Sequence, residues 1–145
     1  MATATRTLEI NVEPEKMFEV LADFNAYPEF LDVVGMTKVE VVRDDGDVKE
    51  VTHWVKKMGA TVYYTLRYRL EEPKKMSWTF VKGQMMKDNN GSWELSSVGE
   101  GKCQAIYSAE VKFGMLVPKS VVSVLVNNEL PDLLAAFKKR AESRS

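Results

Sequence analysis

Few residues in this chain could carry out acid–base or nucleophilic chemistry. There is one histidine, His53, and one cysteine, Cys103, among 145 residues. A single histidine cannot supply a pair of histidine ligands to a metal ion, nor complete a two-histidine carboxylate triad. The residues around it (51–55) contain nothing that resembles a nucleophile or an orienting acid at a loop tip. We therefore expect no metal site, no cofactor and no catalytic triad.

The remaining reactive groups also favour structural roles. The flanks of Cys103 are typical of a strand, which predicts a buried and inert thiol. Asp44, Asp45 and Asp47 surround Gly46 in a pattern typical of a hairpin turn, so they are expected to be solvated. The chain has no glycine-rich phosphate loop. These features argue against hydrolytic or redox catalysis, whereas a cyclase that uses a single acid–base group remains open.

Binding chemistry is better supported, because large rings recur on one face of the predicted strands. Strict alternation over Ala60–Glu71 places Val62, Tyr64, Leu66, Tyr68 and Leu70 on the same side. With the other strands, the predicted inner face carries seven rings: Tyr64, Tyr68, Trp78, Phe80, Trp93, Tyr107 and Phe113. Buried tyrosine hydroxyls need hydrogen-bond partners, and a few polar groups in an apolar shell are typical of small-molecule sites. The alternative is that these rings simply fill the core.

A long amphipathic segment near the C-terminus is expected to cover this face. Its apolar residues recur at helical spacing: Val122, Val126, Leu130, Leu133 and Phe137. A helix over residues 119–142 would be about 36 Å long, close to the roughly 40 Å of a strand over Ala60–Glu71. Pro131 should bend this helix, either to follow the sheet or as a hinge at a cavity entrance. Sheet and helix together predict a two-layer α+β domain.

The order of elements is predicted to be one strand, two short helices, six strands and the long helix. The helices follow the first strand, with Pro14 in the first turn of one and Pro28 near the start of the other. The phase of the strand at residues 48–58 is ambiguous, because both of its faces carry bulky side chains. Asn89-Asn90-Gly91 is expected to precede a strand. The whole chain, residues 1–145, is expected to form a single domain.

Composition sets limits on partners and location. The 20 basic and 21 acidic residues give a formal net charge of −1, so nucleic-acid binding is not favoured. The first twelve residues lack the basic and apolar regions of a signal peptide, and no run approaches the ~18 apolar residues of a membrane span. We expect a cytoplasmic protein, and the sequence does not indicate its oligomeric state.

A likeness to a known family rests on the run DFNAYPEFL at residues 23–31, which follows a helix that begins at a proline. This run resembles the polyketide cyclase/dehydrase and lipid-transport branch of the START/birch-pollen-allergen (SRPBCC) superfamily. It is most similar there to coenzyme Q-binding proteins and bacterial ribosome-association toxins. The GSWEL run at residues 91–95 and the long C-terminal helix fall where that family has them, although Glu13 stands where many relatives have a small capping residue. The resemblance implies a helix-grip fold, in which a curved antiparallel sheet of about seven strands wraps around the helix and encloses a hydrophobic cavity.

The expected function is therefore the binding, transport or chaperoning of a hydrophobic small molecule such as a lipid or isoprenoid quinone. The expected cavity residues are Tyr64, Leu66, Tyr68, Trp78, Phe80, Trp93, Tyr107, Val122, Val126 and Leu130. Two alternatives share the fold signature, namely a ribosome- or protein-associating regulator and a polyketide cyclase or dehydratase. Fold alone does not distinguish among them.

The cavity mouth is expected at two loops that carry methionines beside lysines. Its predicted residues are Phe30, Met85, Met86, Met115 and Leu116. Flexible apolar tips rimmed by lysines suit transient contact with a membrane or a protein, and packing of the tips against the helix pair is the alternative. The basic cluster Lys138-Lys139-Arg140 is either a complement to the helix dipole or a docking patch for a ribosome.

Overall fold

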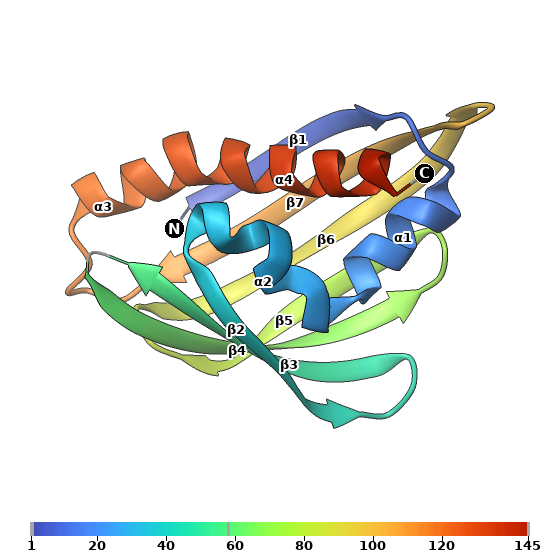
Figure 1. The fold of residues 1–145 in the computed structure, drawn as a ribbon. Coiled ribbons are helices and arrows are strands. Elements are labelled where there is room, and N and C mark those ends of the chain that lie inside the picture. Colours follow the sequence, from blue (N-terminus) through green and yellow to red (C-terminus); the bar gives the residue numbers. More distant parts are fainter. Residues whose placement is uncertain (1, 58, 145) are drawn as a thin grey trace.

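The alternating strands form one curved antiparallel sheet (Figure 1). The computed structural model describes residues 2–57 and 59–144. The seven strands lie in the order β1-β7-β6-β5-β4-β3-β2, so every sequence-adjacent pair from β2 to β7 forms a hairpin and β1 joins the free side of β7. Their bounds are β1 Ala2–Ile10, β2 Met36–Asp44, β3 Val48–Lys57, β4 Ala60–Glu71, β5 Lys75–Gly83, β6 Met86–Gly99 and β7 Lys102–Phe113. β4 has the predicted bounds.

Helices cover one side of this sheet (Figure 1). After β1, the chain forms α1 (Pro14–Ala22), with its proline in the first turn as predicted. The second predicted helix is the short α2 (Tyr27–Phe30), preceded and followed by 3-10 turns at Phe24–Ala26 and Leu31–Val34. The long helix after β7 packs across the concave face of the sheet, which confirms the predicted α+β architecture.

The long helix is continuous but irregular near its middle. It consists of α3 (Lys119–Val124), a π-helical segment (Leu125–Glu129) and α4 (Leu130–Ser143). The N–H of Leu130 donates to the carbonyl of Leu125, five residues earlier. Pro131 follows at once and has no N–H to donate, so the ordinary bonding pattern is interrupted at this point. Pro131 belongs to the first turn of α4, two positions after the π-helical segment ends.

The structure shows which side chains of β3 point toward the core. Val51, His53 and Val55 point toward the helices and are at most 5% exposed. Thr52 lies on the opposite face, where its hydroxyl is 2.7 Å from that of Thr65 on β4. This bond explains why two threonines on the outer face are buried. Met58, the predicted end of this strand, lies outside the described residues.

The expectation that Asn89-Asn90-Gly91 precedes a strand is wrong, because all three residues lie within β6. Gly91 pairs with Ala109 of β7, and the indole of Trp78 packs over its backbone. A Cβ at Gly91 would lie 2.4 Å from Cζ2 of Trp78 and 2.4 Å from the carbonyl oxygen of Ser108. Tertiary packing, and not turn formation, therefore explains the glycine.

This close approach predicts that Gly91→Ala destabilises the protein. Either the Trp78 ring or the β6–β7 pairing must move, which we expect to cost about 1–3 kcal/mol in the free energy of unfolding. Urea unfolding followed by circular dichroism measures the change. Gly114→Ala is the matched control, because a Cβ there would meet nothing closer than 3.7 Å. Equal stability of the two variants would contradict this account of the packing.

Candidate functional site

The sheet and the final helix enclose a cavity with two adjoining compartments. The outer compartment has a volume of about 210 Å³ and lies beneath the π-helical segment and the start of α4. The inner compartment has a volume of about 110 Å³ and lies deeper, between the strands and α2. Five side chains line both compartments and mark where they meet: Met36, Tyr64, Tyr107, Val111 and Leu133.

The hollow exists because only the C-terminal half of the long final helix packs into the core. No residue of α3 or of the π-helical segment is fully buried, whereas Leu134, Phe137 and Ala141 of α4 are. The ring of Phe137 packs edge-on against Tyr27, Phe30 and Trp93, with centroids 5.2–5.4 Å apart. These contacts fix the C-terminal half of the helix against the sheet. The N-terminal half lies over the outer compartment.

Most of the predicted cavity residues lie around this space. Tyr64 and Tyr107 line both compartments, Val126 and Leu130 line the outer one, and the others that line the inner one are Leu66, Tyr68, Trp78 and Trp93. Phe80 and Val122 line neither compartment. Phe80 is half-buried at the margin of the core, and Val122 is half-buried on α3.

The predicted mouth residues divide into two groups. Met86 lines both the outer compartment and a surface groove of about 630 Å³, where it is joined by Met85, Met115 and Leu116. Phe30 lies elsewhere. Its ring packs against Phe137, and the guanidinium of Arg140 lies 5.2 Å from the ring centroid. It thus contributes to the packing that holds α4 in place.

His53 is the most deeply buried polar group of the inner compartment. Its Nε2 is 3.0 Å from the hydroxyl of Tyr68, and its Nδ1 is 3.4 Å from the carbonyl oxygen of Tyr64. Burial lowers the pKa of His53 to about 4 from its ordinary 6.5, so the imidazole is neutral at physiological pH. A carbonyl can only accept, so Nδ1 carries the proton and Nε2 accepts from Tyr68.

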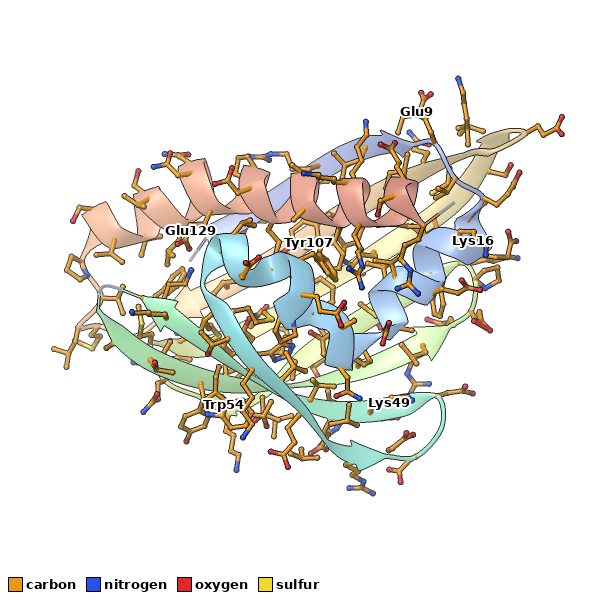
Figure 2. The ribbon with its side chains drawn as sticks, viewed as in Figure 1. Glu9, Lys16, Lys49, Trp54, Tyr107 and Glu129 are labelled. Carbon is orange, nitrogen blue, oxygen red and sulfur yellow. The ribbon has the colours of Figure 1, made fainter. Side chains whose placement is uncertain are left out.

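Two tyrosine hydroxyls in the cavity have no hydrogen-bond partner among the described residues. The hydroxyls of Tyr27 and Tyr68 are bonded to the Leu21 carbonyl and to His53, at 2.5 and 3.0 Å. Those of Tyr64 and Tyr107 make no such bond, and neither oxygen is sealed off by protein atoms. Tyr107 lies between α4 and the sheet (Figure 2).

Both free hydroxyls remain hydrogen-bond donors at neutral pH. Burial raises the pKa of Tyr107 to about 12. Burial also raises the pKa of Tyr64, and the nearby Tyr107 and Glu129 raise it further. The two hydroxyls can therefore each donate a proton to an acceptor atom inside an otherwise apolar cavity.

An ion pair spans the wall of the outer compartment. The ammonium of Lys57, at the end of β3, pairs with the carboxylate of Glu129 in the π-helical segment. It also donates to the carbonyl of Val34 at 2.9 Å. Lys57 is 15% exposed and Glu129 33% exposed, so the pair is partly shielded from water. It links the helix to the sheet above the hollow, and Glu129 is visible there in Figure 2.

Sequence reasoning missed several of the residues around the cavity. Lys57 and Glu129 are 72 positions apart and no spacing relates them. Asn89, whose side-chain oxygen accepts from the indole N–H of Trp78 at 2.9 Å, was hidden by the turn-like Asn-Asn-Gly run. Tyr27 lies in the run at residues 23–31, and nothing in the sequence there indicates that it lines the cavity. Only the alternation of β3 could have indicated that His53 lines the cavity. Of the two faces of this strand, the one that carries Val51, His53 and Val55 is the inward one.

The described residues offer neither a metal site nor a spanning helix. In residues 2–57 and 59–144, no three His, Cys, Asp or Glu side chains are grouped so as to hold a metal ion. None of the helices in that part of the chain has the length and apolar content needed to cross a bilayer. Cys103 is buried, and burial raises the pKa of its thiol to about 11, as expected for an inert cysteine.

A sequence profile of the family described as polyketide cyclase / dehydrase and lipid transport matches residues 1–142. The chain belongs to this family. The match includes every strand and nearly all of the final helix, so it agrees with the resemblance found in residues 23–31 and 91–95. No curated protein sequence matches the chain significantly.

Solved structures with the same fold include members of different functional groups. The Zhui aromatase/cyclase from Streptomyces sp. R1128 is 18% identical, with a TM-score of 0.85 over 99% of this chain and 94% of the other. A START superfamily protein from Mycobacterium smegmatis is 17% identical, with a TM-score of 0.84 and 99% coverage of both chains. A STAR-related lipid transfer protein from Xanthomonas axonopodis is 11% identical, with a TM-score of 0.80 over 96% of this chain and 85% of the other. At these identities the likeness establishes the START-like helix-grip fold alone.

The buried, neutral His53 predicts a specific pH dependence of stability. The unfolded chain takes up this proton near pH 6.5 and the folded chain only near pH 4, so the free energy of unfolding falls as the pH drops through that window. The loss should be about 2 kcal/mol between pH 7 and pH 5. Urea unfolding at both values measures it. His53→Gln should remove this component, and the same pH dependence in the variant would contradict the assignment.

Proposed function

We propose that this protein binds a hydrophobic small molecule in the cavity between its sheet and final helix. The observation that carries the proposal is an apolar cavity with two unpartnered hydroxyls, those of Tyr64 and Tyr107. Both oxygens are reachable from the hollow, so an acceptor atom of a bound ligand could accept a hydrogen bond from each of them. Apolar burial would supply most of the affinity, and the hydroxyls would set the orientation.

The sizes of the compartments favour a ligand with a ring or polar end and an apolar chain. The inner compartment, at about 110 Å³, approaches the ~150 Å³ of an apolar cavity that holds one benzene ring. Rings of Trp78 and Trp93 line it, and these would stack on a planar group. A chain would pass through the outer compartment toward the methionine groove. An isoprenoid quinone, whose carbonyl oxygens accept hydrogen bonds, meets these requirements, as does a lipid with a small polar end.

A cyclase or dehydratase is the second candidate, favoured by the hydrogen-bonded His53 and Tyr68 pair at the inner compartment. A neutral imidazole could exchange a proton with a bound polyketide-like substrate. The low pKa of His53, about 4, makes it a weak base, so this chemistry has less support than binding. Turnover of an aromatic polyketide mimic that is lost in His53→Gln would favour the enzyme over the carrier.

The ribosome-associating alternative has the least support from the surface. Within the basic cluster at residues 138–140, Arg140 donates to Glu29 at 2.7 Å and stacks on Phe30. It is only 22% exposed. The cluster therefore presents two lysines and not three free cations, which is a small patch for binding a phosphate backbone.

Removing the two free hydroxyls should weaken binding of ligands that carry an acceptor. We expect Tyr64→Phe and Tyr107→Phe each to reduce the affinity for a short-chain quinone by about 3- to 10-fold, the effect of one hydrogen bond. Quenching of tryptophan fluorescence measures it, because Trp78 and Trp93 line the inner compartment. An alkylbenzene of similar length is the control ligand and should bind all variants equally. Unchanged quinone affinity in both variants would contradict the proposed orientation.

Filling the outer compartment should block uptake of any ligand. Val126 lines this compartment from the helix, and Val126→Trp would occupy much of its 210 Å³. We expect at least a tenfold loss of affinity for quinone and alkylbenzene alike, since the apolar chain loses its place. Val124→Trp is the matched control, because Val124 is 50% exposed and does not line this compartment. Equal binding by both variants would show that the ligand site lies elsewhere.

A further inference from the structure

We propose that the cavity mouth docks on the surface of an anionic lipid bilayer. The inference rests on the proposed function, because the docking surface surrounds the opening through which a hydrophobic ligand would pass. Its centre is the mouth loop, defined as residues 114–118 between β7 and α3. Figure 1 shows this connection at the opposite end of the molecule from the C-terminus.

The mouth loop presents two large apolar side chains to solvent. Met115 is 90% exposed and Leu116 97% exposed, more than any other large hydrophobic residue described. The loop is nevertheless held at its base, where the Gly114 N–H donates to the Met85 carbonyl at 2.9 Å and the Val117 N–H donates to the Gly114 carbonyl at 3.1 Å. An ordered backbone therefore holds an apolar tip away from the core, which is unfavourable in water unless something else covers it.

The tip adjoins the ligand cavity through the methionine groove. Met115 and Leu116 line the methionine groove together with Met85 and Met86. Met86 also lines the outer compartment, so its side chain lies between the groove and the hollow beneath the helix. A molecule leaving the cavity at this point would pass directly between the apolar side chains of the tip.

Unpaired lysines surround the tip. Lys82, Lys87, Lys112 and Lys119 are exposed, and Lys56 lines an adjoining groove beneath α3. None of the five forms an ion pair within the described part of the chain, where nine other pairs occur. Acidic groups at this end include Asp88, Glu110, Glu129 and, near Lys56, Asp32. Glu129 is paired with Lys57, so the lysines leave a local excess of positive charge on a chain whose formal net charge is −1.

Apolar tips rimmed by lysines fit a bilayer better than a protein. The side chains of Met115 and Leu116 can enter the acyl boundary while the lysines contact lipid phosphates. A stable protein interface buries about 800 Å² on each partner, far more than two side chains at a loop tip provide. The geometry is thus suited to reversible contact with an anionic membrane, with the mouth of the cavity facing the lipid.

Vesicle co-sedimentation tests this inference without a known ligand. The probes are vesicles of phosphatidylcholine alone and of phosphatidylcholine mixed with phosphatidylglycerol, at low and high salt. We expect the intact chain to bind the anionic vesicles, with binding reduced by salt and by omission of phosphatidylglycerol. Met115→Glu/Leu116→Glu should lower the partition coefficient by about tenfold or more. Val98→Glu is the matched control, since Val98 is 50% exposed near the far β6–β7 turn and should bind as the natural chain does.

A second pair of variants tests whether the lysines around the tip contribute to vesicle binding. Lys87→Gln/Lys119→Gln should weaken binding to anionic vesicles only, whereas Lys138→Gln/Lys139→Gln, at the other end of the final helix, should not. Thermal unfolding of each variant confirms that it is folded. Failure of the natural chain to bind any vesicle, or equal binding by the Met115/Leu116 variant, would overturn the inference. Concentration-dependent dimers that are lost in that variant, without vesicle binding, would assign the tip to a second copy of the chain.

These outcomes are separate from a failure of the proposed function. Ligand binding is measured in solution by tryptophan quenching on the natural chain, with no vesicles present. A chain that binds quinone but no vesicle loses only the docking inference. A chain that binds vesicles but neither quinone nor alkylbenzene loses the carrier proposal and retains a membrane-contacting surface.

Discussion

The packing of Phe137 against Tyr27, Phe30 and Trp93 is the interaction on which the cavity depends. It joins the final helix, the α2 region and the β6 strand at one point, and it fixes the C-terminal half of the helix at contact distance. The helix continues through the π-helical segment without a break, and no residue of its N-terminal half is fully buried. The hollow therefore lies under the half of the helix that is not packed into the core, where the Lys57–Glu129 pair links it to β3.

Some polar groups in the hollow have hydrogen-bond partners within the protein and others do not. The groups without partners determine what kind of ligand the cavity can bind. Tyr27, Tyr68, His53 and Trp78 satisfy one another or nearby carbonyl and amide oxygens, as buried groups must. Tyr64 and Tyr107, at the junction of the compartments, do not. The structure thus presents a rigid aromatic shell, held by its own hydrogen bonds, with two donors left over at the place where a ligand would sit.

The helix above the cavity is also the most irregular element of the fold. Pro131 withholds one N–H, and the preceding residues adopt a π-helical arrangement in which Leu130 bonds to Leu125. The same segment carries Glu129, whose pairing with Lys57 links the helix to β3. π-Helical turns often occur at functional sites. Here the irregular segment, the ion pair and the outer compartment coincide, so the part of the helix with the weakest burial is also the part nearest the mouth.

The sequence by itself determined most of the elements and, apart from the ambiguous β3, which of their faces point inward. Alternation in Ala60–Glu71 and Lys102–Phe113 and helical spacing from Val122 to Phe137 are local properties, fixed by backbone geometry, and they sufficed for the fold. Only tertiary structure decided how far the helix stands from the sheet, because that distance depends on contacts between residues far apart in sequence. For the same reason it alone paired Lys57 with Glu129, left Tyr64 and Tyr107 without partners, and placed Gly91 beneath the ring of Trp78 and not in a turn.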